Sequence, residues 1–133
     1  MEFQAAFYEP LKPEKHQLNA VKKEEIMNHF EQVPWKALVD LVNAADLGKI
    51  YHQPAFEVEN TTNRNSLWVS TVNLTDWYII YTRPKRVKIW FGLTDKMKED
   101  HMTDVEGKSI EDVKSCLNAL LNNDLSFLES YII

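Results

Sequence analysis

Residues 67–91 read LWVSTVNLTDWYIIYTRPKRVKIWF, and this stretch decides the fold that we expect from the sequence. It is dominated by β-branched and aromatic residues, which are typical of strands, and turn-forming residues interrupt it twice. It therefore predicts three strands, at residues 66–72, 77–82 and 86–91. The alternating residues 55–59 predict another strand before them. Together these strands predict a four-stranded antiparallel meander.

The turn lengths decide which side chains share a face of this sheet, because neighbours along a strand point to opposite faces. A four-residue turn at each connection pairs Val72 with Trp77 and Thr82 with Val87. One face is then apolar, and the second face combines large aromatic side chains with cations. A three-residue turn at Pro84 would instead flip the last strand. From the second face and the basic cluster beside it we select as candidate binding residues Trp68, Tyr81, Arg83, Arg86, Lys88 and Trp90.

Two helices are predicted before the sheet and one or two after it. Residues 13–31 and 34–47 carry apolar residues at helical spacing, and a proline near the start of each suits a first helical turn. Ser109 is expected to cap a third helix, in a capping box where Asp112 replaces the usual glutamate. Asp124 is expected to cap a last short helix.

The chain is expected to form a single α+β domain over residues 1–133, with the C-terminal helices packed on one face of the sheet. Two segments have no regular structure in this prediction. Residues 1–13 are expected to be an extended N-terminal arm, because Pro10 and Pro13 prevent a continuous helix, and this arm is a candidate cover for the second face. Residues 94–108 are expected to be a long irregular loop.

The composition argues against several classes of function. The net charge of −5 gives no support to nucleic-acid binding, which usually needs a basic surface, and the three glycines lie outside phosphate-binding motifs. The single cysteine, Cys116, excludes an intrachain disulfide and a multi-cysteine zinc cage. We expect no cofactor and no metal. Without a signal-like N-terminus or a long apolar run, we expect a cytoplasmic protein with no membrane partner.

No motif of a known catalytic class occurs, so we expect no catalytic residues, although a site assembled from distant residues stays open. His101 is the one candidate for chemistry. Glu99, Asp100 and Asp104 surround it in the sequence, and carboxylates beside a histidine raise its basicity. A charged loop without catalytic function has the same composition, however. Cys116 lies in an apolar helical pattern and is expected to be a core residue.

The leading hypothesis is a small acidic protein-interaction module without catalytic activity. It would bind another protein or a second copy of itself through the aromatic and cationic second face. Inhibitors, immunity-type partners and adaptors have comparable size and charge. The alternative is a small-molecule-binding or hydrolytic protein, with a pocket between sheet and helices and His101 contributed by residues 94–108.

Overall fold

The structure is a computed structural model that describes residues 2–90 and 92–133, apart from the side chains of residues 19, 20 and 47. The elements in this part of the chain are β1 (Phe3–Tyr8), β2 (His16–Val21), α1 (Lys23–Gln32), α2 (Trp35–Ala44), a 3-10 helix η1 (Leu47–Lys49), β3 (Ala55–Asn60), β4 (Asn65–Thr71), β5 (Trp77–Ile89), β6 (Thr94–Lys108), α3 (Ile110–Leu121) and α4 (Leu125–Tyr131). The strands form one antiparallel sheet with the order β2-β1-β3-β4-β5-β6.

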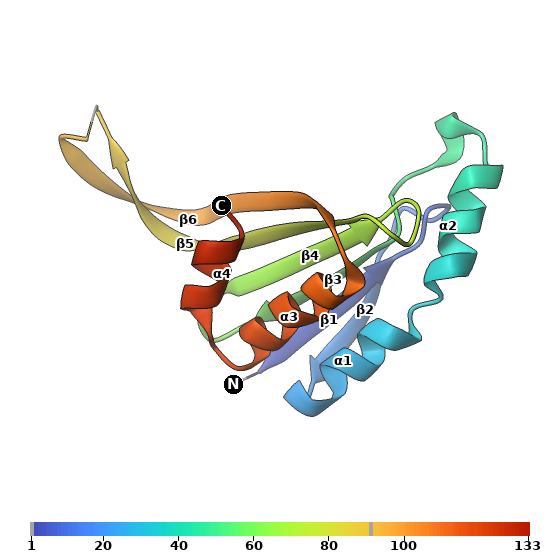
Figure 1. Cartoon of the computed structure of the whole chain (residues 1–133), viewed down its shortest axis with the longest axis horizontal. Helices are drawn as coiled ribbons and strands as arrows, with labels where there is room; N and C mark the ends of the chain where they lie inside the picture. The colour runs from blue at the N-terminus through green and yellow to red at the C-terminus, as the bar shows by residue number, and fades with distance from the viewer. Residues whose placement is uncertain (1, 91) are drawn as a thin grey trace.

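The helices α1, α3 and α4 lie against one face of this sheet, as Figure 1 shows. The core forms between the two layers and includes residues that are fully buried, among them Ile26, Phe30, Phe56, Leu67, Ile79, Leu117 and Leu128. At the end of the sheet, Trp35 at the start of α2 packs edge-on against Trp77, with 4.9 Å between the ring centroids. We call the opposite face of the sheet the open face.

The α+β class and the antiparallel sheet are confirmed, but the predicted four-stranded sheet behind two N-terminal helices is wrong. Two strands precede the helices, because residues 3–8 pair with residues 16–21 on one side and with β3 on the other. The segment expected as an extended N-terminal arm therefore contains β1, which lies inside the sheet between β2 and β3. As a consequence, α1 begins at Lys23 rather than near residue 13.

The predicted loop at residues 94–108 is also wrong, since this whole segment is β6. It pairs with β5, which runs from Trp77 to Ile89 without the turn expected at Pro84. Pro84 lies where the register shifts between Arg83 and Lys85, and a bulge of this kind tolerates a residue that has no N–H to donate. The hairpin turn lies at the far end of β5, after Ile89.

The predicted register between β4 and β5 is wrong by one residue. Thr71, not Val72, lies opposite Trp77, so the connection contains five residues instead of four. The Thr71 hydroxyl oxygen accepts hydrogen bonds from the backbone N–H groups of Asn73 and Leu74. Leu74 has a left-handed backbone, with φ of 70°, which completes the longer turn. Because a one-residue slip exchanges faces, Trp77 and Tyr81 lie on the helix-covered face.

The predicted helix caps are confirmed. The Ser109 hydroxyl accepts a hydrogen bond from the Asp112 N–H, and the Asp112 carboxylate accepts one from the Ser109 N–H, which is the expected capping box. The Asp124 side chain caps α4 by accepting from the Phe127 N–H. Cys116 is buried in α3, and burial raises the pKa of its thiol to about 12.

Candidate binding site

The six candidate binding residues lie in three separate places, so they do not form one face. Trp68 is half-buried on the open face. Tyr81 and Arg83 lie on the helix-covered face, with exposed fractions of 1% and 3%. The other three, Arg86, Lys88 and Trp90, lie at the distal end of the hairpin formed by β5 and β6. This scatter follows from the register slip and from the missing turn at Pro84.

Arg83 serves as an anchor for α4. Its Nε and Nη2 atoms donate to the two carboxylate oxygens of Glu129, each at 2.8 Å, and Lys85 donates to the same carboxylate at 2.9 Å. The two cations, chiefly through these hydrogen bonds, lower the pKa of Glu129 to about 2. The guanidinium carbon also lies 4.2 Å from the ring centre of Tyr81. These contacts satisfy a buried charge and leave it unavailable for a partner.

Tyr81 is likewise a structural residue. Its hydroxyl donates to the buried Asn65 side chain. Burial, followed by the nearby Glu129 carboxylate, raises the pKa of Tyr81 to about 12. A buried phenol with a satisfied hydrogen bond contributes to the core, and no part of its ring is presented to solvent.

The exposed members of the candidate set belong to a projecting hairpin. The pairing of β4 with β5 ends at the Ser66–Thr82 pair, so from Arg83 outward β5 pairs with β6 alone among the described strands. Figure 1 shows that this end of the hairpin extends beyond the helices and the other strands. From here on, "the arm" means residues 84–98 and no longer the N-terminal segment of residues 1–13. None of its described side chains is buried.

The arm has a different charge from the rest of the molecule. Its basic residues are Lys85, Arg86, Lys88, Lys96 and Lys98. Its one acidic residue is Asp95, so the arm has a formal charge of +4. Since the whole chain has a charge of −5, the remainder has a charge of −9. A basic element therefore projects from an acidic body.

Large apolar side chains are exposed at and near the tip of the arm. Trp90 is 72% exposed, Leu93 is 86% exposed and Met97 is 44% exposed. The backbone of Trp90 is left-handed, with φ of 54°, and Gly92 follows with φ of 84°. A left-handed conformation costs a bulky residue about 1 kcal/mol or more, and such strain is concentrated at functional sites. The turn thus holds a tryptophan in an exposed and unfavourable conformation.

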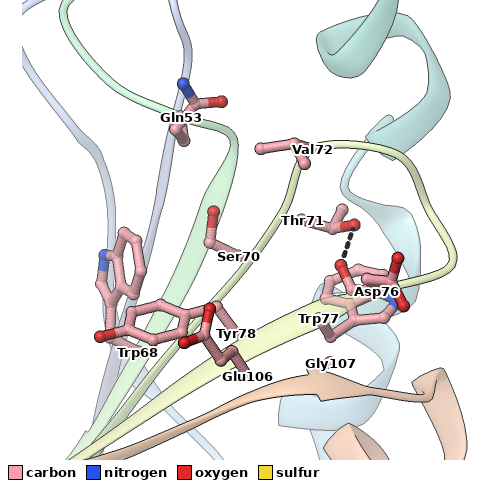
Figure 2. A pocket seen from close by; sticks show the side chains of 10 residues that line it. All are labelled: Gln53, Trp68, Ser70, Thr71, Val72, Asp76, Trp77, Tyr78, Glu106 and Gly107. Atoms are coloured by element: carbon pink, nitrogen blue, oxygen red, sulfur yellow. Dashed lines mark hydrogen bonds between the residues drawn. The ribbon is translucent and has the colours of Figure 1, made fainter.

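A cavity of about 480 Å³ lies beside the five-residue connection between β4 and β5. We call it the turn pocket. Figure 2 shows the rings of Trp68 and Tyr78 together on one side of it, with Glu106 next to Tyr78. The two rings meet edge-on, with their centroids 6.2 Å apart. Its remaining lining comes from Gln53, Ser70, Thr71, Val72, Asp76, Trp77 and Gly107.

The surroundings of the turn pocket are acidic. Asp76 and Glu106 line it, both exposed. The Tyr78 hydroxyl donates to the carboxylate of Asp104 on β6, and this hydrogen bond is the main reason why the pKa of Tyr78 rises to about 12. Aromatic rings bordered by carboxylates favour a ligand that is cationic or that combines cations with an apolar group.

His101 has different surroundings from those that the sequence suggested. It lies opposite Arg83 on the helix-covered side, whereas Asp104 points to the open face, where Tyr78 binds it. Burial, followed by the charges of Arg83, Lys85 and Lys98, lowers the pKa of His101. It is not among the residues that line the turn pocket. His101 therefore lies on a strand, β6, and not on the loop that the alternative hypothesis assumes.

Among the described residues, no group of three or more histidine, cysteine, aspartate or glutamate side chains is arranged to hold a metal ion. No helix in the same part of the chain is long and apolar enough to cross a lipid bilayer. Comparison with known proteins finds no relationship: no family model matches the chain, and no curated protein or solved structure is significantly similar to it.

Proposed function

We propose that this chain is a non-catalytic protein-interaction module and that the arm is its binding element. The observation that carries this proposal is the exposure of Trp90, Leu93 and Met97 on a basic hairpin that projects from an acidic body. Tryptophan and arginine are the residues that contribute most to binding energy in protein interfaces. Here Trp90 and Arg86 lie on the same exposed hairpin.

The structure of the arm supports a role in binding rather than in stability. Its described side chains are half-buried or exposed, so it contributes little to the core. A projecting hairpin with several exposed apolar residues would be a liability for solubility unless a partner covers them. The charged side chains along both strands limit non-specific strand pairing without removing the apolar tip.

The binding residues of the proposal leave out Trp68, Tyr81 and Arg83 from the candidate set. Trp68 lies on the open face, outside the arm. Tyr81 and Arg83 are engaged in the core and with Glu129, so we assign them to the support of the arm. Arg86, Lys88 and Trp90 remain as binding residues, and Leu93 and Met97 join them. Neither Leu93 nor Met97 stands out in the sequence as a binding residue, because Met97 falls in the expected irregular loop at residues 94–108 and Leu93 falls between that loop and the predicted strand at residues 86–91.

The proposal is tested by protein capture with matched variants. Immobilised parent protein and a Trp90→Ala variant are exposed to an extract of cells that produce the protein naturally. Tyr51→Ala serves as the control, because Tyr51 is 62% exposed but lies outside the arm. We expect the parent and the control to retain the same protein, and Trp90→Ala to retain at least tenfold less of it. Loss of a central aromatic residue weakens the binding free energy by about 2 kcal/mol, which is more than a tenfold change in affinity. Equal retention by all three proteins would contradict the proposal.

A further inference from the structure

We propose that the partner of the arm is a second copy of this chain, and that the tip of each arm docks in the turn pocket of the other copy. This inference rests on the proposed function, since it names the partner of the same binding element. The dimer has two-fold symmetry and contains the same contact twice. Closed two-fold dimers are the commonest form of self-association in proteins.

Charge complementarity is the first reason for a second copy. The arm has a formal charge of +4, whereas the residues outside it sum to −9. Acidic side chains concentrate around the turn pocket, at Asp76, Asp104 and Glu106. An arm placed there brings Arg86 and Lys88 close to these carboxylates. Such complementarity favours the correct docking orientation and speeds association.

The chemistry of the turn pocket is the second reason. Its volume of about 480 Å³ falls within the range of cavities that bind compact ligands, roughly 300–1,000 Å³. Trp68 and Tyr78 offer ring surfaces on which an indole packs edge-on or offset. Trp90 is exposed and has no ring partner among the described residues of its own chain. The pocket thus fits an aromatic side chain accompanied by cations, which is the composition of the arm.

The geometry of β5 allows the contact to be reciprocal. The turn pocket lies at the beginning of β5, beside Trp77 and Tyr78, and the arm lies at its other end. The strand has 13 residues, which corresponds to about 40 Å at roughly 3.3 Å per residue. Two copies placed antiparallel along their hairpins therefore bring each arm to the pocket of the other. Because both contacts are satisfied at once, the assembly closes instead of growing into a filament.

Sedimentation velocity on the purified protein tests this inference. We expect the parent and Tyr51→Ala to be dimers at low salt and to dissociate as the salt concentration rises, because the contact joins opposite charges. We expect Trp90→Ala to be monomeric under the same conditions. A circular dichroism melt of each protein checks that the variants are folded. A parent protein that is monomeric at every salt concentration, or a Trp90→Ala variant that dimerises as well as the parent, would overturn the inference.

A pair of charge reversals provides a more specific test. One variant carries Arg86→Glu and Lys88→Glu in the arm, and the other carries Asp104→Lys and Glu106→Lys beside the pocket. Each variant alone opposes like charges and is expected to be monomeric. An equimolar mixture is expected to form a heterodimer. In it the altered arm of one variant meets the altered pocket of the other, and the unaltered arm meets the unaltered pocket, so both contacts join opposite charges. Two folded variants that remain monomeric after mixing would overturn the inference.

These outcomes also separate this inference from the proposed function. A monomeric parent that still captures another protein through Trp90 would overturn the second copy as partner and leave the interaction module in place. A monomeric parent that instead binds an oligonucleotide through Trp90 would overturn both. Dimers that form through surfaces insensitive to Trp90 and to the charge reversals would likewise overturn the arm-to-pocket contact.

Discussion

The Glu129 carboxylate accepts hydrogen bonds from Arg83 and Lys85, and these contacts tie α4 to the base of the arm. Glu129→Gln should lower the free energy of unfolding by about 2 kcal/mol, because Arg83 stays buried without its counter-charge. This value is already reduced for the 35% exposure of the Glu129 side chain. Urea unfolding measures the change. The matched control is Glu31→Gln, which removes an exposed ion pair with Lys114 and should cost less than about 0.5 kcal/mol. Equal losses in the two variants would contradict the anchoring role.

The pH dependence of this contact has a defined sign. The folded-state pKa of Glu129 is about 2, below its ordinary value of 4.5, so ionised Glu129 stabilises the folded state. Its contribution is complete above about pH 4.5 and is lost as the pH falls towards 2. The stability difference between the parent and Glu129→Gln should therefore shrink across this window, because the glutamine does not titrate. A stability difference that stays constant from pH 7 down to pH 2 would show that the charge of Glu129 is not the source of the stabilisation.

At the scale of elements, the arm should be separable from the fold. Replacing residues 86–97 with a two-residue Asn-Gly turn joins Lys85 to Lys98, which already lie opposite each other. We expect the free energy of unfolding to change by less than about 1 kcal/mol, since no described side chain of the arm is buried. Thermal and urea unfolding provide the measurement. A shortened chain that is unfolded or strongly destabilised would mean that the arm stabilises the body.

The elements differ in how far local sequence determines them. The helix caps and the β3 strand were predictable because each depends on neighbours in the sequence, such as Ser109 with Asp112 and buried Phe56 beside outward Glu57. By contrast, β6 is polar and charged, and its strand conformation depends on pairing with β5 rather than on its own propensity. The register of Trp77 depended on one additional residue in the turn, which the Thr71 side chain stabilises.

This difference of one residue in the turn also determines which of the candidate binding residues share a face of the sheet. With four residues in the turn, Trp68 shares a face with Tyr81; with five, the two rings lie on opposite faces of the sheet. The prediction that Arg86, Lys88 and Trp90 are available for binding remains a prediction, and their place on an exposed hairpin supports it. Their relation to the turn pocket could not be inferred from the sequence, because the pocket depends on the register of three strands.

At the scale of the whole molecule, the separation of charge is the property that organises recognition. A charge of +4 concentrated on the arm, against −9 elsewhere, gives the molecule a strong electrostatic asymmetry. Such asymmetry orients an approaching partner and increases the rate of association, in a manner that weakens with salt. The exposed apolar tip then supplies the short-range contacts that slow dissociation. Charge and apolar surface thus have separate roles on the same hairpin.

The central claim is that the tip of the arm contacts a partner, and site-specific photo-cross-linking tests it most directly. A photoreactive phenylalanine analogue is placed at Trp90 in one protein and at Tyr51 in a second, both of which are well-exposed aromatic positions. Each is irradiated in cells that produce the protein naturally. We predict a discrete cross-linked protein adduct from position 90 and none from position 51. Absence of an adduct at position 90, or the same adducts from both positions, would contradict the account.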